Sequence, residues 1–196
     1  MQTTPARWID EPFTYEDYLH LPDNGKRWEI VRGELFMTPA PTTIHQRASR
    51  NLERILDDYV TEHDLGEIFD APTDVVFSDT DITQPDLLYV SKERGEIITE
   101  PNIQGAPDLI VEIKAPSTKK LDAQLKRRLY ARYRVREYWV VDPEDKTVDV
   151  FVLRGRGYRH YGTYRESDVL ETPLFSQLKI PIQQIFARPS WWKASK

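Results

Sequence analysis

Apolar residues recur at helical spacing through residues 44–63, and this spacing predicts a long amphipathic helix. Its apolar positions fall on one side of the helix: Ile44, Ala48, Leu52, Ile55, Leu56, Tyr59 and Val60. A stripe of this width is typical of a helix that packs on a sheet. Thr42 or Thr43 stands where the N-cap of this helix is expected.

Two further helices are predicted on either side of it. The first covers residues 13–19, where Thr14 can cap the helix and Asp17 takes the position of a capping-box acid. The second runs from about residue 118 to 133 and is rich in arginine and lysine.

Runs of Val, Ile, Leu and Tyr bounded by polar or proline-containing stretches predict strands. We expect strands at 73–77, 82–90, 108–114 and 137–142, and a hairpin that pairs 147–153 with 158–164. Residues 27–37 predict a strand or a hairpin with a kink at Gly33, ended by Pro39 and Pro41.

The order of helix, three strands, helix and further strands favours an α/β or α+β sandwich over a doubly wound fold. The length of 196 residues fits one domain, and no linker divides the chain. We therefore expect a single domain over 1–196. Its parts are an N-terminal helix and hairpin (13–40), a core (44–142) and a C-terminal hairpin and tail (146–196).

Composition excludes several classes of protein. Hydrophobic residues make up 39% of the chain, and no apolar run approaches the roughly 18 residues that a membrane span needs. Cysteine is absent, which excludes disulfides and thiolate ligands, and the first residues contain no apolar signal core. No dinucleotide-binding or Walker glycine motif occurs, and the histidines lack zinc-ligand spacing. A cytoplasmic protein without membrane contact is expected.

Positive charge is concentrated in one part of an acidic chain. Residues 114–136 contain nine basic residues and one acid, a net charge of +8, while the whole chain carries −5. Such a segment can be the electrostatic footprint of a polyanion such as a nucleic acid. The alternative is a solvated, arginine-rich helix face, which is the commoner outcome for a charge run in an arbitrary protein.

Two carboxylates interrupt strands that are apolar on both faces. Asp86 lies near the start of QPDLLYV, and Glu112 lies deep in PDLIVEIKAP. A buried charge survives by pairing or by binding a metal, so these two acids are candidate metal ligands. Strand alternation places Glu112 and Lys114 side by side on one face. Asp108 lies about 13 Å further back at ~3.3 Å per residue, too far to share an ion, and is given a structural role.

The succession of Pro85-Asp86, Glu112-x-Lys114, a basic helix and EYWVVD resembles the PD-(D/E)xK restriction-endonuclease-like superfamily. It is most similar to the Uma-type endonucleases, from RWEIVRGELFMTPAP through IHQR to LKRRLYARYRVREYWVVDP. This resemblance implies a central mixed β-sheet flanked by helices and a Mg²⁺- or Mn²⁺-dependent endonuclease acting on DNA. Many members of the family have an apolar or small residue at Lys114 and a helix lysine at Lys126; this sequence has both, and either lysine could serve the site.

Other side chains are candidates for the same site. Glu34 shares a strand face with apolar residues if the strand is regular, but turns to solvent if Gly33 bulges it. His45 could lie near the site at the start of its helix, or could cap or pack there. Tyr130 lies one helical turn from Lys126 and could line a cleft with it, or simply belong to the core.

Lys119 and Lys120 fall in the first turn of their predicted helix, where the macrodipole disfavours cations. Basic side chains at a helix start are well placed to bind an anion, so this turn predicts a phosphate site for DNA.

Two other functions keep the same fold. One is a non-catalytic module that binds nucleic acid or protein, and the other is a structural or regulatory protein whose basic helix docks an acidic partner. Intact Asp86, Glu112 and Lys114 favour the nuclease. A symmetric homodimer is expected, because it would allow cuts on both DNA strands.

Overall fold

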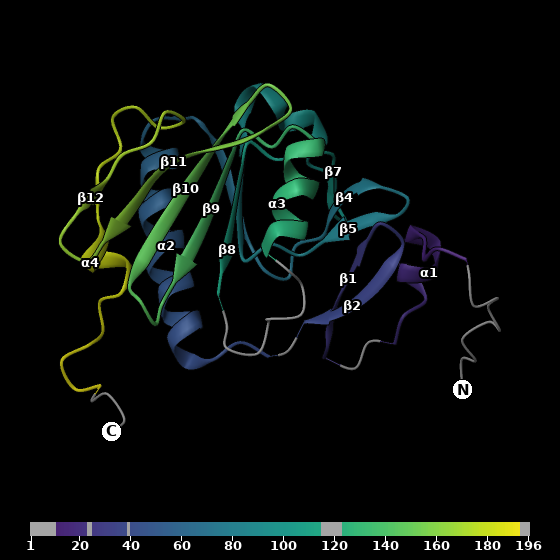
Figure 1. Ribbon diagram of the computed structural model, residues 1–196, viewed down its shortest axis with the longest axis horizontal. Helices are drawn as coiled ribbons and strands as arrows, with labels where there is room; N and C mark the ends of the chain where they lie inside the picture. The colour runs from purple at the N-terminus through teal and green to yellow at the C-terminus, as the bar shows by residue number, and fades with distance from the viewer. Residues whose placement is uncertain (1–10, 23–24, 39, 115–122, 193–196) are drawn as a thin grey trace.

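The computed structural model describes residues 11–22, 25–38, 40–114 and 123–192. Most of its elements belong to two sheets with helices packed against them (Figure 1). In chain order they are α1 (Tyr15–Leu19), β1 (Arg27–Val31), β2 (Glu34–Thr38), α2 (Thr43–Glu62), β3 (Gly66–Asp70), β4 (Val75–Ser78), β5 (Asp81–Thr83), β6 (Leu87–Ser91), the 3₁₀ helix η1 (Lys92–Ile97), β7 (Ile103–Gln104), β8 (Leu109–Ile113), α3 (Ala123–Arg132), β9 (Glu137–Asp142), β10 (Thr147–Arg154), β11 (Gly157–Arg165), β12 (Val169–Leu170), β13 (Ile180–Pro181) and α4 (Ile182–Ile185).

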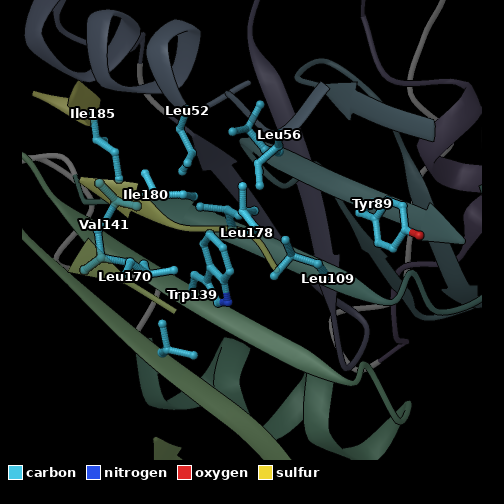
Figure 2. Close-up of a cluster of buried hydrophobic side chains, with 14 of the residues drawn as sticks. Leu52, Leu56, Tyr89, Leu109, Trp139, Val141, Leu170, Leu178, Ile180 and Ile185 are labelled. Carbon is cyan, nitrogen blue, oxygen red and sulfur yellow. The ribbon is translucent and has the colours of Figure 1, made fainter. Parts of the chain in front are cut away.

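The larger sheet has the strand order β11-β10-β9-β8-β6-β3. β8 and β9 run parallel, and the other neighbours are antiparallel, so the sheet is mixed as expected. α2 covers one face with Leu52 and Leu56, which meet Leu109 and Trp139 in the main core (Figure 2). α3 covers the other face with buried Leu129 and Tyr130. The expected mixed sheet flanked by helices is confirmed.

The smaller sheet has the order β2-β1-β5-β4-β7 and begins with the hairpin β1–β2. Arg32 and Gly33 form its two-residue turn, both with positive φ, 55° and 75°. This is the backbone conformation of a type I′ turn, whose twist matches that of paired strands. Gly33 also packs against Pro12, where an added Cβ would lie 2.3 Å from the proline Cβ. The hairpin alternative for residues 27–37 is therefore confirmed.

The capping predictions are also confirmed. Thr14 and Asp17 form both bonds of the capping box at α1, and the Thr42 side chain accepts a hydrogen bond from the His45 N–H at the start of α2. The predicted basic helix is present as α3. Its expected first turn, with Lys119 and Lys120, lies outside the described residues, so the phosphate site there remains a prediction.

One strand prediction needs correction, and one strand is additional to those predicted. Residues 82–90 are two strands in different sheets, β5 and β6, because Pro85 lacks the N–H that a continuous strand would need. The strand Gly66–Asp70 was not predicted. In the described part of the chain no helix has the length and apolar character to cross a membrane.

Asp108 has the structural role expected of it. Its carboxylate is fully buried and accepts a hydrogen bond from the Ser91 N–H at 2.9 Å. Arg94 and Arg136 pair with its other oxygen at 3.4 and 3.3 Å. The side chain thus fixes the loop that leads into β8.

Candidate active site

Asp86 and Glu112 meet across β6 and β8. The antiparallel register pairs Leu87 with Val111, and one step further the same register brings Asp86 opposite Glu112. The Ile113 N–H donates to Asp86 Oδ2 at 2.8 Å, which ties Asp86 to the end of β8. Directly opposed residues of antiparallel strands share a face, so the structure brings these two predicted acids together.

Glu112 receives its partners from α3. Its Oε1 accepts hydrogen bonds from Tyr130 Oη at 2.6 Å and Lys126 Nζ at 2.8 Å. These donors are one helical turn apart and point from α3 onto the sheet face that carries Glu112. Lys126 and Tyr130 thus both contact Glu112, but Tyr130 is fully buried and belongs to the core, the alternative that the sequence left open for it.

Lys126 also binds a second acid, which the sequence analysis missed. Its Nζ lies 2.9 Å from Glu29 Oε1, and the Glu29 side chain is 1% exposed. Glu29 further accepts a hydrogen bond from the Gln84 N–H at 2.9 Å, in the segment that leads to Asp86. The signal for Glu29 was the one used for Glu112, an acid inside an apolar strand, here RWEIV.

Glu34 does not belong to this cluster. The tight turn at Arg32–Gly33 reverses the chain, and Glu34 is exposed opposite Val31 at the start of β2. Of the two alternatives for Glu34, the structure has the one that turns it to solvent.

Lys114 is also placed differently from the expectation. β8 ends at Ile113, and the Lys114 ammonium donates to Asp142 Oδ2 at 2.9 Å, with half of its side chain exposed. In the structure Lys114 therefore pairs with Asp142, at the end of the neighbouring parallel strand, and its expected place beside the two carboxylates stays a prediction. The lysine in contact with Glu112 is Lys126.

His45 contacts Asp86 from the first turn of α2. Its Nε2 lies 3.2 Å from Asp86 Oδ2, and the residue is 5% exposed. Arg27 adds a more distant charge, with its guanidinium 3.7 Å from Asp86 Oδ1. Of the two alternatives for His45, the structure has the one that places its ring beside Asp86. Its burial makes it a partner of Asp86 and disfavours direct contact with a nucleic-acid phosphate.

The carboxylates differ in protonation because their surroundings differ. Burial raises the pKa of Glu112 to about 7; Lys126 opposes this shift, whereas the charges of Glu29 and Asp86 add to it. Burial also acts on Asp86, but His45 and the Ile113 N–H outweigh it and lower the pKa of that carboxyl. The pKa of Lys126 is raised, since its two glutamates outweigh burial. Three acids thus gather around the Lys126 ammonium and the Arg27 guanidinium. With all three acids ionised the net charge is −1, which favours a cation.

The basic segment does not present one free face. Arg132 lies 3.8 Å from Asp81, Arg134 donates to the Gly155 carbonyl, and Arg136 pairs with Asp108. Arg127 lies over the ring of Phe151, 5.2 Å from its centroid. Part of the positive charge of this segment therefore stabilises the fold. Only its other basic side chains would be available to a substrate.

Comparison with known proteins identifies the family and the fold of the chain. Residues 15–183 match the family Uma2, described as "Putative restriction endonuclease". The chain belongs to the Uma2 family. Comparison with curated proteins gives no match. Among solved structures, a crystal structure described as a "putative nuclease belonging to DUF820" from Anabaena variabilis ATCC 29413 is similar. The two share 21% identity with a TM-score of 0.75, over 89% of this chain and 98% of that chain, and thus the fold.

The donors of this Uma2 site fit a divalent metal ion. The described residues contain no group of three or more His, Cys, Asp or Glu side chains placed to hold one. Two facing carboxylates are nevertheless enough for Mg²⁺ or Mn²⁺, which prefer oxygen ligands and keep several waters. A bound cation would favour the ionised form of Glu112, whose pKa is raised chiefly by burial and further by the charges of Glu29 and Asp86.

A first prediction concerns the stability of the metal-free Uma2 protein. The folded state keeps a proton on Glu112 that the unfolded chain releases, so stability should fall as pH rises from about 4.5 to about 7. A shift of one pKa unit corresponds to ~1.4 kcal/mol, so the free energy of unfolding should fall by roughly 3 kcal/mol over this pH range. Urea unfolding at pH 5 and pH 7.5 measures it. Glu112→Gln should lose this part of the pH dependence; an unchanged dependence in the variant would contradict the assignment to Glu112.

Proposed function

We propose that this Uma2 protein is a metal-dependent endonuclease that hydrolyses phosphodiester bonds, with DNA as its substrate. One observation carries the proposal: Asp86, which is buried, and Glu112, whose side chain is 17% exposed, lie opposite each other while the Lys126 ammonium contacts Glu112 at 2.8 Å. Membership of the Uma2 family supports a nuclease. The net negative charge of the three carboxylates and their basic partners supports a bound metal cation.

Asp86 and Glu112 would hold a Mg²⁺ or Mn²⁺ ion through carboxylate oxygens. The hydrogen bonds from described residues to Glu112 fall on Oε1, and those to Asp86 fall on Oδ2. Oε2 of Glu112 and Oδ1 of Asp86, which the Arg27 guanidinium approaches to 3.7 Å, are therefore the oxygens without a hydrogen bond among the described residues. When bound, the ion supplies a Lewis acid for the phosphate and lowers the pKa of a water molecule.

The surrounding side chains position these groups. Tyr130 and Lys126 fix the orientation of Glu112, while His45 and the Ile113 N–H fix that of Asp86. Lys126 also holds a positive charge beside the place where phosphate oxygens would gather, and a fixed charge of this kind stabilises negative charge that develops in a transition state. We infer that Lys126, and not Lys114, is the working lysine of the site.

Cleavage of DNA by wild-type protein and Asp86→Asn tests the proposal. We expect Mg²⁺ or Mn²⁺ to support nicking of plasmid or branched DNA, EDTA to stop it, and Asp86→Asn to reduce it about 100-fold or more. Asp64→Asn is the matched control, because Asp64 is exposed and pairs only with Lys92 among the described residues. Equal cleavage by wild type and Asp86→Asn, or none by the wild type with either metal, would reject the proposal in favour of a non-catalytic module.

A homodimer is part of the proposal. A symmetric pair of sites would cut both strands of a duplex, whereas one site nicks one strand at a time. Linear product formed directly from supercoiled plasmid, without accumulation of the nicked form, would support paired sites.

A further inference from the structure

The hairpin β10–β11 carries a second concentration of positive charge, which the proposed site does not use. Residues 154–165 read RGRGYRHYGTYR and contain four arginines, three tyrosines and one histidine but no acid. This segment is +4 on a chain of −5. Arginines interleaved with aromatic residues are the composition of surfaces that bind single-stranded nucleic acid.

The structure places this segment at the edge of the larger sheet. β11 is the edge strand, joined to β10 by a two-residue turn in which Gly155 has a φ of 60°. In Figure 1 β10 and β11 lie beyond β9, on the side away from β8, and β6 and β3 follow β8 in the strand order. No other strand of the described sheet pairs with the outer edge of β11. Of its side chains, Arg159, His160, Tyr161 and Arg165 are exposed, whereas Tyr158 and Tyr164 pack against the cores.

A β-bulge turns one aromatic side chain out of this edge strand. β10 pairs Val150 with Gly162 and Phe151 with His160, so Tyr161 is the extra residue between them. Bulges re-aim side chains and are frequent at sheet edges. Tyr161 is 51% exposed, one of the most exposed large apolar side chains of the described chain.

Tyr161 borders a hollow of about 300 Å³, lined also by Val152, Arg154, Arg159 and His160. Within the described residues Arg159 forms no ion pair, and the Arg154 guanidinium contacts only the Leu153 carbonyl, at 3.4 Å. His160 is held in place by Thr163 at 3.0 Å and Asp149 at 3.4 Å. The hollow thus combines two unneutralised guanidinium groups with an exposed aromatic ring beside a positioned imidazole.

We propose that this hollow binds a single-stranded stretch of nucleic acid, with phosphates on Arg154 and Arg159 and a base stacked on Tyr161. Guanidinium groups match phosphate geometry, and an aromatic ring accepts the face of any base. An unpaired strand fits better than a duplex, because the bases of a duplex hide their faces in the stack. The inference rests on the proposed function, since it assigns part of the substrate of the same enzyme.

The position of the hollow makes it an anchor for substrate at a distance from the cut. Arg159 is aligned through β10 with Glu137, while Glu112 is aligned with Val140 of the same strand β9. Three strand spacings of ~4.8 Å and three residues of ~3.3 Å separate Arg159 from Glu112 along the sheet, about 17 Å in all. The offset of three residues puts their side chains on opposite faces: Arg159 is aligned with Val152 on the face that α2 covers, and Glu112 points to α3. The hollow would therefore hold a flanking, unpaired part of a branched or gapped substrate that passes around the β11 edge of the sheet.

Fluorescence anisotropy with a labelled single-stranded oligonucleotide in EDTA tests the inference without cleavage. We expect Arg154→Ala/Arg159→Ala to weaken binding and to lower the slope of log K against log salt by about 1.4, or ~0.7 for each phosphate contact. Tyr161→Ala should weaken binding about fivefold or more, and Tyr161→Phe should retain it. Arg50→Ala/Arg54→Ala removes the same charge from exposed positions of α2 and should change both quantities less.

The outcomes separate this inference from the proposed function. If the wild type cleaves DNA with metal but the hairpin variants keep their affinity and salt slope, the anchor is wrong and the nuclease stands. If cleavage fails while the hairpin variants lose affinity, the anchor stands without the enzyme. Two further results would also overturn the anchor. One is that Tyr161→Ala loses as much affinity for duplex DNA as for the single strand. The other is that the protein prefers a poly-glutamate peptide to the oligonucleotide.

Discussion

Lys126→Ala should destabilise the protein and remove its metal-dependent cleavage. Lys114→Ala should have little effect on stability or on cleavage. Lys126 is nearly buried and is the shared partner of Glu29 and Glu112. Its removal leaves two buried carboxylates facing each other, and breaking a buried ion pair costs about 3–5 kcal/mol. Loss of its charge beside the reacting phosphate should lower the rate about 10²- to 10³-fold. Lys114 is half exposed and pairs with Asp142, so its loss should cost no more than about 1 kcal/mol.

Urea unfolding and the plasmid assay measure the two effects in the same pair of variants. A third variant, Lys126→Met combined with Glu29→Gln and Glu112→Gln, separates stability from chemistry. It should regain much of the lost stability, because no buried charge remains unpaired, and should stay inactive. Full activity of Lys126→Ala together with an inactive Lys114→Ala would reverse the assignment of the two lysines.

The parts of the fold that the sequence predicted are those whose residues are buried on both faces. β8 and β9 are continuous apolar runs because α2 and α3 cover the sheet on either side. An acid in such a run is conspicuous, and for that reason Asp86 and Glu112 could be predicted as neighbours. The stripe of α2 is equally clear, since only one face of a helix is buried.

The predictions that differ from the structure concern residues whose partner in the folded protein cannot be inferred from the local sequence pattern. Gly66–Asp70 contains only two apolar residues among glycine and acids, so its strand exists because β6 pairs with it along its whole length. The alternation that grouped Lys114 with Glu112 gave the direction of a side chain and not its partner. The long lysine side chain reaches Asp142, a residue that lies 28 positions away in the sequence.

Glu29 shows the same limit within the first hairpin. The sequence of residues 27–37 predicts one strand or a kinked hairpin. It makes Glu34, beside the predicted kink, the candidate acid of this segment. The two-residue turn at Arg32–Gly33 instead places Glu34 at the surface, and Glu29 on the buried face with Val31. Only the approach of α3 gives Glu29 its partner, Lys126, and that approach is not visible in the hairpin sequence.

Glu29→Ala should therefore destabilise the protein by about 3 kcal/mol or more, whereas Glu34→Ala should stay within about 0.5 kcal/mol of the wild type. Glu29 is 1% exposed and binds both Lys126 and the Gln84 N–H. Its loss leaves a buried N–H without an acceptor and removes one of the two anions that hold the Lys126 ammonium. Glu34 is exposed, so the same change at the other strand of the hairpin is the matched control.

Cleavage by the same two variants shows whether Glu29 matters to the site or only to the fold. Without Glu29, Lys126 would pair with Glu112 alone, and the charge that raises the pKa of Glu112 would be smaller. Glu112 would then ionise at lower pH, so the rise of cleavage rate with pH should shift downward in Glu29→Gln, a variant that keeps the side-chain volume. A variant of lower stability with an unshifted pH profile would restrict Glu29 to a structural role. A Glu34 variant that lost both stability and activity would contradict the placement of both acids.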